Sequence, residues 1–164
     1  MADQVRWISR AAGNEHILRL KETEKFMHIP YEHGGRNENG IDCYGLGVLL
    51  YRHFFDIDID TLKSPSKGNA YINGIKKAYD TVVSEWRRVE VPSFLDVIAF
   101  DTVHIKNRQI VSHIGFFYKT NMMLHISETT KFPCVEKISN YGHTIIGYYR
   151  HAKLFESDLC IQSI

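Results

Sequence analysis

Three side chains have the types and settings needed for nucleophilic chemistry: Cys43, His113 and His125. Cys43 is expected in the first turn of a helix, where unpaired N–H groups and partial positive charge lower the pKa of a thiol. The thiolate is the reactive form, and the same N–H groups can stabilise an oxyanion once an acyl carbon is attacked. A cysteine nucleophile also needs a base, which a histidine would supply. These residues therefore predict acyl transfer.

The two histidines lie in short β-branched and aromatic runs, Gln109–Tyr118 and Met122–Ser127, which predict two strands of a hairpin. A three-residue loop between them places His125 diagonal to His113 on one face, with about 7–8 Å between Cα atoms. The two imidazoles can then form a hydrogen bond, through which His125 would fix the tautomer and orientation of His113. A two-residue loop would instead shift the register by one and place the histidines on opposite faces.

Residues 12–86 show mainly the helical spacing of apolar side chains. The expected helices are a short amphipathic one ending before Pro30, one over about Cys43–Phe55, and one from Ala70 to about Arg87. Asp42 stands where an N-cap belongs. Gly45 and Gly47 each weaken a helix by about 1 kcal/mol relative to alanine, so they indicate that another backbone or side chain packs closely on that turn.

From Pro92 onward the pattern changes to short strands separated by polar turns. The expected strands are Asp96–Asp101, Gln109–Tyr118, Met122–Ser127, Cys134–Ile138 and Ile145–Arg150. Helices followed by a run of strands predict an α+β fold, with N-terminal helices packed on an antiparallel β-sheet. The helix that begins at Cys43 is expected to pack against this sheet.

Composition limits the remaining classes. A length of 164 residues predicts a single domain over residues 1–164. The formal net charge of +1 gives no global field to hold nucleic acid or an anionic membrane, and the basic pairs Lys76-Lys77 and Arg87-Arg88 are typical of a solvated helix face. Residues 1–20 carry scattered charges rather than a signal peptide, and no run of about eighteen apolar residues occurs. We therefore expect synthesis in the cytoplasm, no nucleic-acid binding and no membrane insertion.

The three cysteines are odd in number and lack paired spacing, which disfavours a disulfide framework. Cys134 and Cys160 are interpreted as structural residues, since free cysteine is commonly a small buried hydrophobe. Zinc held by Cys43, His113 and His125 is an alternative, because cysteine and histidine are favoured zinc ligands. Their wide spacing contains no paired ligand motif, so we predict no metal and no cofactor.

Five blocks of sequence occur in a recognisable order. They are Pro30-Tyr31-Glu32-His33-Gly34-Gly35, Gly40-Ile41-Asp42-Cys43-Tyr44-Gly45-Leu46, Asp96-Val97-Ile98-Ala99-Phe100, Ser112-His113-Ile114-Gly115-Phe116 and Leu124-His125-Ile126. Together they resemble the motif series of the NlpC family of cysteine peptidases, papain-like enzymes that cut peptide bonds in bacterial cell walls. The resemblance covers about residues 12–150. It implies a papain-like NlpC fold and peptidoglycan stem peptides as substrate. It also implies Cys43 as nucleophile, His113 as base, His125 as third polar member, and Tyr31 as an oxyanion-site hydroxyl beside the Cys43 N–H.

Tyr44 stands where most secreted members have serine, and Leu95-Asp96 where they have a Gly-Asp pair. An aromatic residue after the cysteine, a stand-alone domain and no signal peptide resemble the branch encoded in phage tail-gene clusters and gene transfer agents. The closing segment Gly147–Arg150 resembles the arginine strand of that branch. This resemblance implies an enzyme carried at a phage tail tip, opening the cell wall during DNA delivery, with tail hub or tail-tip proteins as partners.

In that setting the protein would reside in the virion tail after synthesis in the host cytoplasm. Two alternatives stay open at this point. One is a tail-tip assembly or plug protein that uses the fold as a binding module. The other is an exported antibacterial effector, which shares the chemistry and differs in its delivery.

Overall fold

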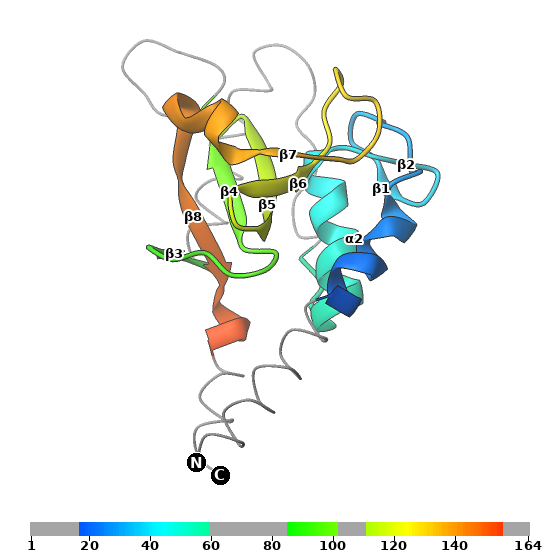
Figure 1. The fold of residues 1–164 in the computed structure, drawn as a ribbon. Helices are drawn as coiled ribbons and strands as arrows, with labels where there is room; N and C mark the ends of the chain where they lie inside the picture. The colour runs from blue at the N-terminus through cyan, green and yellow to red at the C-terminus, as the bar shows by residue number, and fades with distance from the viewer. Residues whose placement is uncertain (1–16, 60–84, 102–110, 156–164) are drawn as a thin grey trace.

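The computed structural model describes residues 17–59, 85–101 and 111–155, and shows helices beside an antiparallel sheet (Figure 1). Its helical elements are η1 (Thr23–Phe26), α2 (Cys43–Phe55) and η2 (Ile138–Thr144), with residues 17–22 and 152–155 also helical. Its strands are β1 (Arg36–Asn37), β2 (Gly40–Ile41), β3 (Trp86–Val89), β4 (Val97–Phe100), β5 (His113–Lys119), β6 (Met122–His125), β7 (Cys134–Lys137) and β8 (Ile145–His151). The predicted α+β class is confirmed.

The main sheet has six strands in the order β3-β8-β4-β5-β6-β7, and every neighbouring pair is antiparallel. A second, two-stranded sheet pairs β1 with β2. This small hairpin contacts α2 at the end where Cys43 lies, as Figure 1 shows. The element order therefore brings the start of α2 and the β5–β6 hairpin into the same half of the molecule.

Helix α2 has the bounds that the sequence predicts, because a capping residue lies at each of its ends. Asp42 caps the first turn by accepting a hydrogen bond from the Gly45 N–H at 2.8 Å. Asp56 ends the helix in the left-handed conformation at φ 54°, with its N–H bonded to the carbonyls of the last turn. The N-cap prediction for Asp42 is confirmed.

The two helix glycines are required by close packing, as expected. A Cβ on Gly45 would lie 2.1 Å from the carbonyl oxygen of Gly35. A Cβ on Gly47 would lie 2.7 Å from the ring of Phe116 on β5. The first contact packs the β1–β2 hairpin against the helix, and the second packs the helix against the sheet.

The helix predicted from Ala70 to about Arg87 ends earlier than expected, because Glu85 is helical and Trp86 begins a strand, while residues 60–84 lie outside the described part of the chain. Trp86 and Arg87 belong to β3, where Trp86 pairs with His151 of β8. The Trp86 ring is buried and meets the rings of Tyr51 and His151 at centroid distances of 5.2 and 5.1 Å. Long-range pairing with β8 thus overrides the local helical spacing.

The predicted strands are all present, with ends that differ by a few residues and with residues 109–110 outside the described ranges. The β5–β6 turn differs in length from the three-residue loop considered above. The turn consists of two residues, because Lys119 pairs with Met122. The register then shifts between Phe117 and Lys119, so that Phe117 pairs with Met123. This bulge restores the register that a three-residue loop would give, and the histidines share one face.

Buried apolar side chains form two clusters, one on each face of the main sheet. The cluster on the α2 face includes Leu46, Leu50, Phe116 and Leu124. The cluster on the opposite face includes Ile98, Phe100, Met123 and Ile138. Successive strand residues alternate between the clusters, as the period of two requires.

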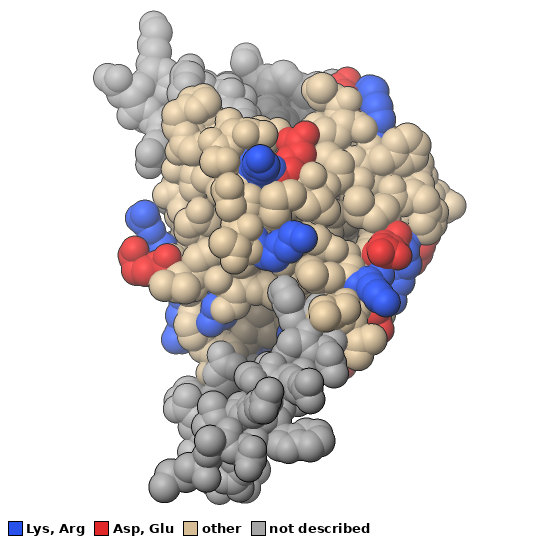
Figure 2. All heavy atoms as spheres, viewed as in Figure 1, with Lys and Arg blue, Asp and Glu red and all other residues tan. Residues whose placement is uncertain are grey.

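Charged side chains of both signs are scattered over the visible face of the molecule, in keeping with the small net charge (Figure 2). Among the described residues, no helix is both long and apolar enough to pass through a membrane.

Candidate active site

Asp42 fixes the backbone around Cys43, the first residue of α2. Its carboxylate accepts hydrogen bonds from the N–H groups of Gly45 at 2.8 Å and Gly34 at 3.0 Å. The Arg36 guanidinium also donates to it at 2.6 Å, and both side chains are largely buried. A carboxylate with three donors is well satisfied, so the position of the helix start is tightly determined.

The Cys43 thiol is held in its protonated form. Burial, with a smaller contribution from the negative charge of Asp42, raises the pKa of this thiol to about 11. The backbone N–H groups of Ile114 and Tyr44 and the charge of Arg36 oppose this rise and are outweighed. The helix N–H of Tyr44 lowers this pKa as expected, but desolvation exceeds that effect, so the net shift is upward rather than the downward one expected from the helix N-terminus.

The sulfur of Cys43 lies beside β5. The Ile114 N–H acts on the thiol, and strand N–H groups point along the sheet rather than out of its faces. Ile114 directly follows His113, whose ring lies against Phe100 on the face of the sheet opposite α2. Within the described part of the chain, no hydrogen bond joins the thiol to the His113 ring.

The two histidines are in direct contact, as the sequence predicts. His113 Nε2 lies 3.2 Å from His125 Nδ1, and the rings meet edge to face at 5.4 Å between centroids. Phe100 lies against the His113 ring at 5.7 Å between centroids. Burial, helped by the neighbouring His125, lowers the pKa of His113 to about 4. Burial also lowers the pKa of His125, although Glu136 opposes that shift.

Glu136 on β7 is a site residue that sequence reasoning missed. Its Oε2 lies 3.2 Å from Nε2 of His125, and the Tyr141 hydroxyl donates a hydrogen bond to the same oxygen. The Tyr141 hydrogen bond, followed by the interaction with His125, lowers the pKa of Glu136. The group is therefore a carboxylate at neutral pH and can only accept hydrogen bonds.

The Glu136 carboxylate determines the tautomers of both histidines. Because Glu136 accepts, the proton of neutral His125 resides on Nε2, which leaves a lone pair on Nδ1. That lone pair accepts from Nε2–H of His113, so Nδ1 of His113 is left unprotonated. The chain of contacts leaves one ring nitrogen of His113 free to take up a proton.

The strand pattern contains a signal for Glu136. Cys134 pairs with His125 across β6 and β7, and Glu136 is two residues further along the same face. Residues 126–133, which connect these strands, are too long and irregular to fix that register from sequence. The alternation therefore marks Glu136 only once the Cys134 pairing is known.

The two remaining residues of interest are placed near the site. The backbone of Tyr31 forms a parallel bridge with Ile41, two residues before Cys43, and its ring packs on the core. Its role at an oxyanion site stays a prediction. Cys134 is half-buried, with Sγ 3.5 Å from Nε2 of His125. Cys160 lies outside the described residues.

The closing strand β8 is tied to the site region by a buried ion pair. Arg150 donates from Nε and Nη2 to the two carboxylate oxygens of Asp96 at 2.9 and 2.8 Å. Leu95 precedes this aspartate and adopts a φ of 65°, in the left-handed region that favours glycine. The Leu95 N–H bonds to the Phe117 carbonyl at 2.7 Å, which anchors the strained turn to β5.

Comparison with known proteins gives one family. The sequence profile of the NlpC/P60 family matches residues 28–144. A search of curated protein sequences found no match.

Two solved structures are similar in fold. One is a protein of Staphylococcus aureus subsp. aureus Mu50 described as similar to lipoprotein, NLP/P60 family, with a TM-score of 0.58 and 18% identity over 84% of this chain. The other is the NlpC/p60 domain of peptidoglycan hydrolase SagA, with a TM-score of 0.52 and 15% identity over 82% of this chain. The chain spans 41% of the staphylococcal structure and 96% of the SagA domain. At these identities the likeness shows the fold.

Proposed function

We propose that this chain, which belongs to the NlpC/P60 family, is a cysteine peptidase that cleaves peptide bonds in the stem peptides of peptidoglycan. The observation that carries the proposal is the hydrogen bond between His113 and His125, together with the N–H of Ile114, the residue after His113, acting on the Cys43 thiol. SagA, whose domain this chain resembles in fold, is described as a peptidoglycan hydrolase, which supports the substrate class.

The first half of the reaction forms a thioester. Nδ1 of His113 takes the thiol proton as the Cys43 sulfur attacks the carbonyl carbon, so the nucleophile is generated only during attack. The Cys43 N–H and the Tyr31 hydroxyl are the proposed donors to the resulting oxyanion. The His113 imidazolium then protonates the leaving amine, and the carbon–nitrogen bond breaks.

The second half restores the enzyme. Nδ1 of His113 removes a proton from water, which attacks the thioester carbon and expels the Cys43 sulfur. The proton returns to the sulfur, and the product leaves as a carboxylic acid. Throughout, His125 keeps His113 oriented, and Glu136 stabilises the positive charge that develops on the pair.

For the biological setting we propose a phage or phage-like tail tip. Tail hub or tail-tip proteins would be its partners, the virion tail its location, and DNA delivery through the cell wall its purpose. Support comes from residue types that resemble the phage tail branch of the family, the aromatic Tyr44 directly after the cysteine and Arg150 in the closing strand β8. An exported antibacterial effector would share the site and differ in its delivery, which the genome neighbourhood distinguishes.

A second candidate function is a tail-tip assembly or plug protein that uses the fold for binding. The observation that favours it is the state of the nucleophile: the thiol's pKa is raised to about 11, and among the described contacts it has no hydrogen bond to His113. In that case the surface of the domain, rather than Cys43, would carry the function.

The test is digestion of purified peptidoglycan, with released fragments identified by mass spectrometry. The parent chain should release fragments with new amino and carboxyl ends within a stem peptide, and the Cys43→Ala variant should release none. A Cys160→Ala variant is the matched control for loss of a thiol. Equal release by the parent chain and the Cys43→Ala variant would refute the peptidase and favour the binding module.

A further inference from the structure

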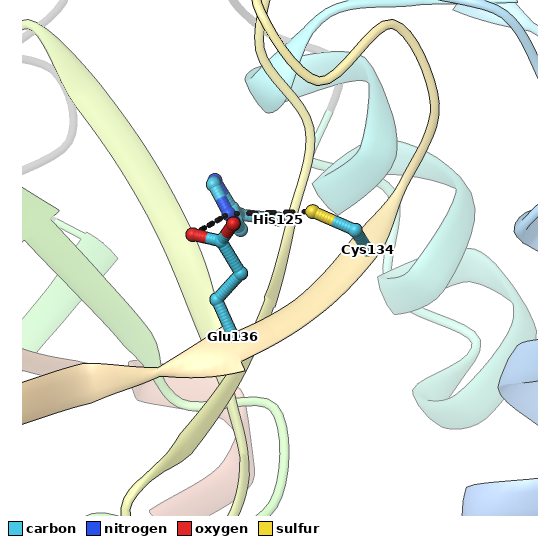
Figure 3. Close-up of side chains that lie close together, drawn as sticks. All are labelled: His125, Cys134 and Glu136. Atoms are coloured by element: carbon cyan, nitrogen blue, oxygen red, sulfur yellow. Dashed lines mark hydrogen bonds and ion pairs between the residues drawn. The ribbon is translucent and has the colours of Figure 1, made fainter. Parts of the chain in front are cut away.

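Three potential metal ligands converge on the side of His125 that faces away from His113. They are Nε2 of His125, Sγ of Cys134 and Oε2 of Glu136, and all three atoms lie within 4.8 Å of one another. Figure 3 shows the sulfur and the carboxylate approaching the ring from β7.

The strand register explains why these groups meet. Cys134 is paired with His125 across β6 and β7, and Glu136 follows two residues later on the same face. The cluster is therefore a consequence of the sheet rather than of a loop. His125 is buried, whereas Cys134 and Glu136 are partly exposed, so an ion can reach the cluster from solvent.

We propose that His125, Cys134 and Glu136 form a zinc site, and that zinc bound there switches off the chemistry of His113. The switching half of this proposal rests on the proposed peptidase function, whereas the metal site itself does not.

The two donor separations measured from His125 fit tetrahedral zinc. Bond lengths of about 2.0–2.1 Å to nitrogen or oxygen and about 2.3 Å to sulfur, at tetrahedral angles, put nitrogen and sulfur about 3.5 Å apart. The same geometry puts nitrogen and oxygen about 3.3 Å apart. The observed separations from His125 Nε2 are 3.5 Å to Cys134 Sγ and 3.2 Å to Glu136 Oε2.

The donor types also select the metal. A thiolate and an imidazole suit zinc, whereas calcium and magnesium prefer oxygen ligands alone. On binding, the Cys134 thiol loses its proton to solvent and forms the sulfur–zinc bond. Three protein ligands leave a fourth position for water. The Tyr141 hydroxyl, which bonds to Glu136, is placed to hold that carboxylate in position.

Occupation of the site would reverse the tautomers of the histidine pair. Zinc on Nε2 of His125 takes the place of the proton there, so the neutral ring carries its proton on Nδ1. Nδ1–H then donates to Nε2 of His113, which becomes the acceptor. The single proton of His113 moves to Nδ1, the nitrogen that must accept the Cys43 proton. No proton is gained or lost on either ring, yet the base is blocked.

The first test measures binding without activity. The full chain carrying Cys43→Ala and Cys160→Ser, which removes the two other thiols, is titrated with zinc chloride by calorimetry. One zinc ion per chain is expected. Adding Cys134→Ser or, in a second variant, Cys134→Ala should weaken binding at least about tenfold, because losing a residue that only supports a metal ligand already costs about 10–100-fold. Thermal unfolding checks that each variant is folded. Equal affinity with and without Cys134 overturns the proposal.

The second test measures inhibition, on chains that keep Cys43 and carry Cys160→Ser. The rate of peptidoglycan cleavage is compared with and without zinc within each variant, so differences in basal rate cancel. Zinc should slow the parent at least about tenfold, reversibly with a chelator, and should slow the Cys134→Ser variant far less. Equal inhibition of both would place zinc at Cys43 and refute the switch. Zinc binding that depends on Cys134 in a chain without peptidase activity would retain the site and refute the proposed function.

Discussion

Replacing Glu136 with glutamine tests whether the histidine pair depends on a negative charge. The substitution keeps the shape of the side chain but removes its charge, and its amide can either accept from His125 or donate to it. The Oε2–Nε2 distance is 3.2 Å and the Glu136 side chain is 35% exposed, so the interaction is strongly screened. With a dielectric constant between about 40 and 80, the attraction to a full positive charge on His125 is about 1–3 kcal/mol.

This energy predicts the size of the effect. Because about 1.4 kcal/mol corresponds to a factor of ten in rate, kcat should fall about 5- to 150-fold while KM changes little. The upper part of the range requires that His113 pass its Nε2 proton to His125 during the reaction. A fall near the lower end would mean that the positive charge stays on His113, further from the carboxylate.

The pH dependence of activity distinguishes an electrostatic role of Glu136 from a purely structural one. Glu136 raises the pKa of His125, against the effect of burial. Removing the charge lowers that pKa, and the active form has both rings neutral. The acidic limb of the kcat/KM profile should therefore move to lower pH in the Glu136→Gln variant.

Peptidoglycan cleavage is measured over a pH series, with the exposed Glu128→Gln variant as a matched control for loss of a carboxylate. The reasoning is refuted if Glu136→Gln changes kcat less than twofold and leaves the acidic limb in place. A variant with lost activity and a lowered melting temperature would indicate disrupted packing, and Tyr141→Phe then serves as the second probe. That variant keeps the carboxylate, and a fall of less than about threefold in kcat is expected.

Three further predictions concern the nucleophile and the turn before β4. The rate at which iodoacetamide alkylates Cys43 should climb throughout pH 7–10, because the thiol's pKa is raised to about 11; a plateau above about pH 8.5 would contradict burial of the thiol. Asp96→Asn should lower the free energy of unfolding in urea by about 3–5 kcal/mol, since it leaves Arg150 without its buried charge partner; a loss below about 1 kcal/mol would show the pair to be dispensable. Leu95→Gly should relieve about 1–2 kcal/mol of backbone strain but lose about 2–5 kcal/mol of buried side chain, so urea unfolding should show net destabilisation, and a stabilised variant would contradict this balance.

Much of the scaffold follows from local sequence signals. Both ends of α2 are marked by residues next to it, the N-cap Asp42 and the left-handed Asp56, so its bounds are predictable to the residue. The strands follow from β-branched and aromatic runs between polar turns. Trp86 shows the limit of such signals, because its strand exists only through pairing with β8, far away in the sequence.

The site is predictable only in part, since its electrostatics and its outermost member depend on tertiary contacts. The field of a helix N-terminus is a local property, but the desolvation that raises the Cys43 pKa comes from packing against β5. Glu136 is similarly invisible without the β6–β7 register. The β5–β6 hairpin is a mixed case: the face shared by His113 and His125 is predictable, while the bulge that achieves it with a two-residue turn is not.

Both proposed states of the site depend on which atom occupies Nε2 of His125. A proton there, held by Glu136, leaves Nδ1 of His113 able to accept; a zinc ion there makes the same nitrogen a donor. Because the His113 pKa is lowered to about 4 and the Cys43 pKa is raised to about 11, both side chains are neutral at rest. No ionic attraction between them therefore favours the tautomer of His113 in which Nδ1 can accept a proton. A neutral pair is therefore more sensitive to the state of His125 than a thiolate–imidazolium pair would be. The burial that keeps Cys43 and His113 neutral therefore makes the reactivity of Cys43 depend on the state of the cluster formed by His125, Cys134 and Glu136.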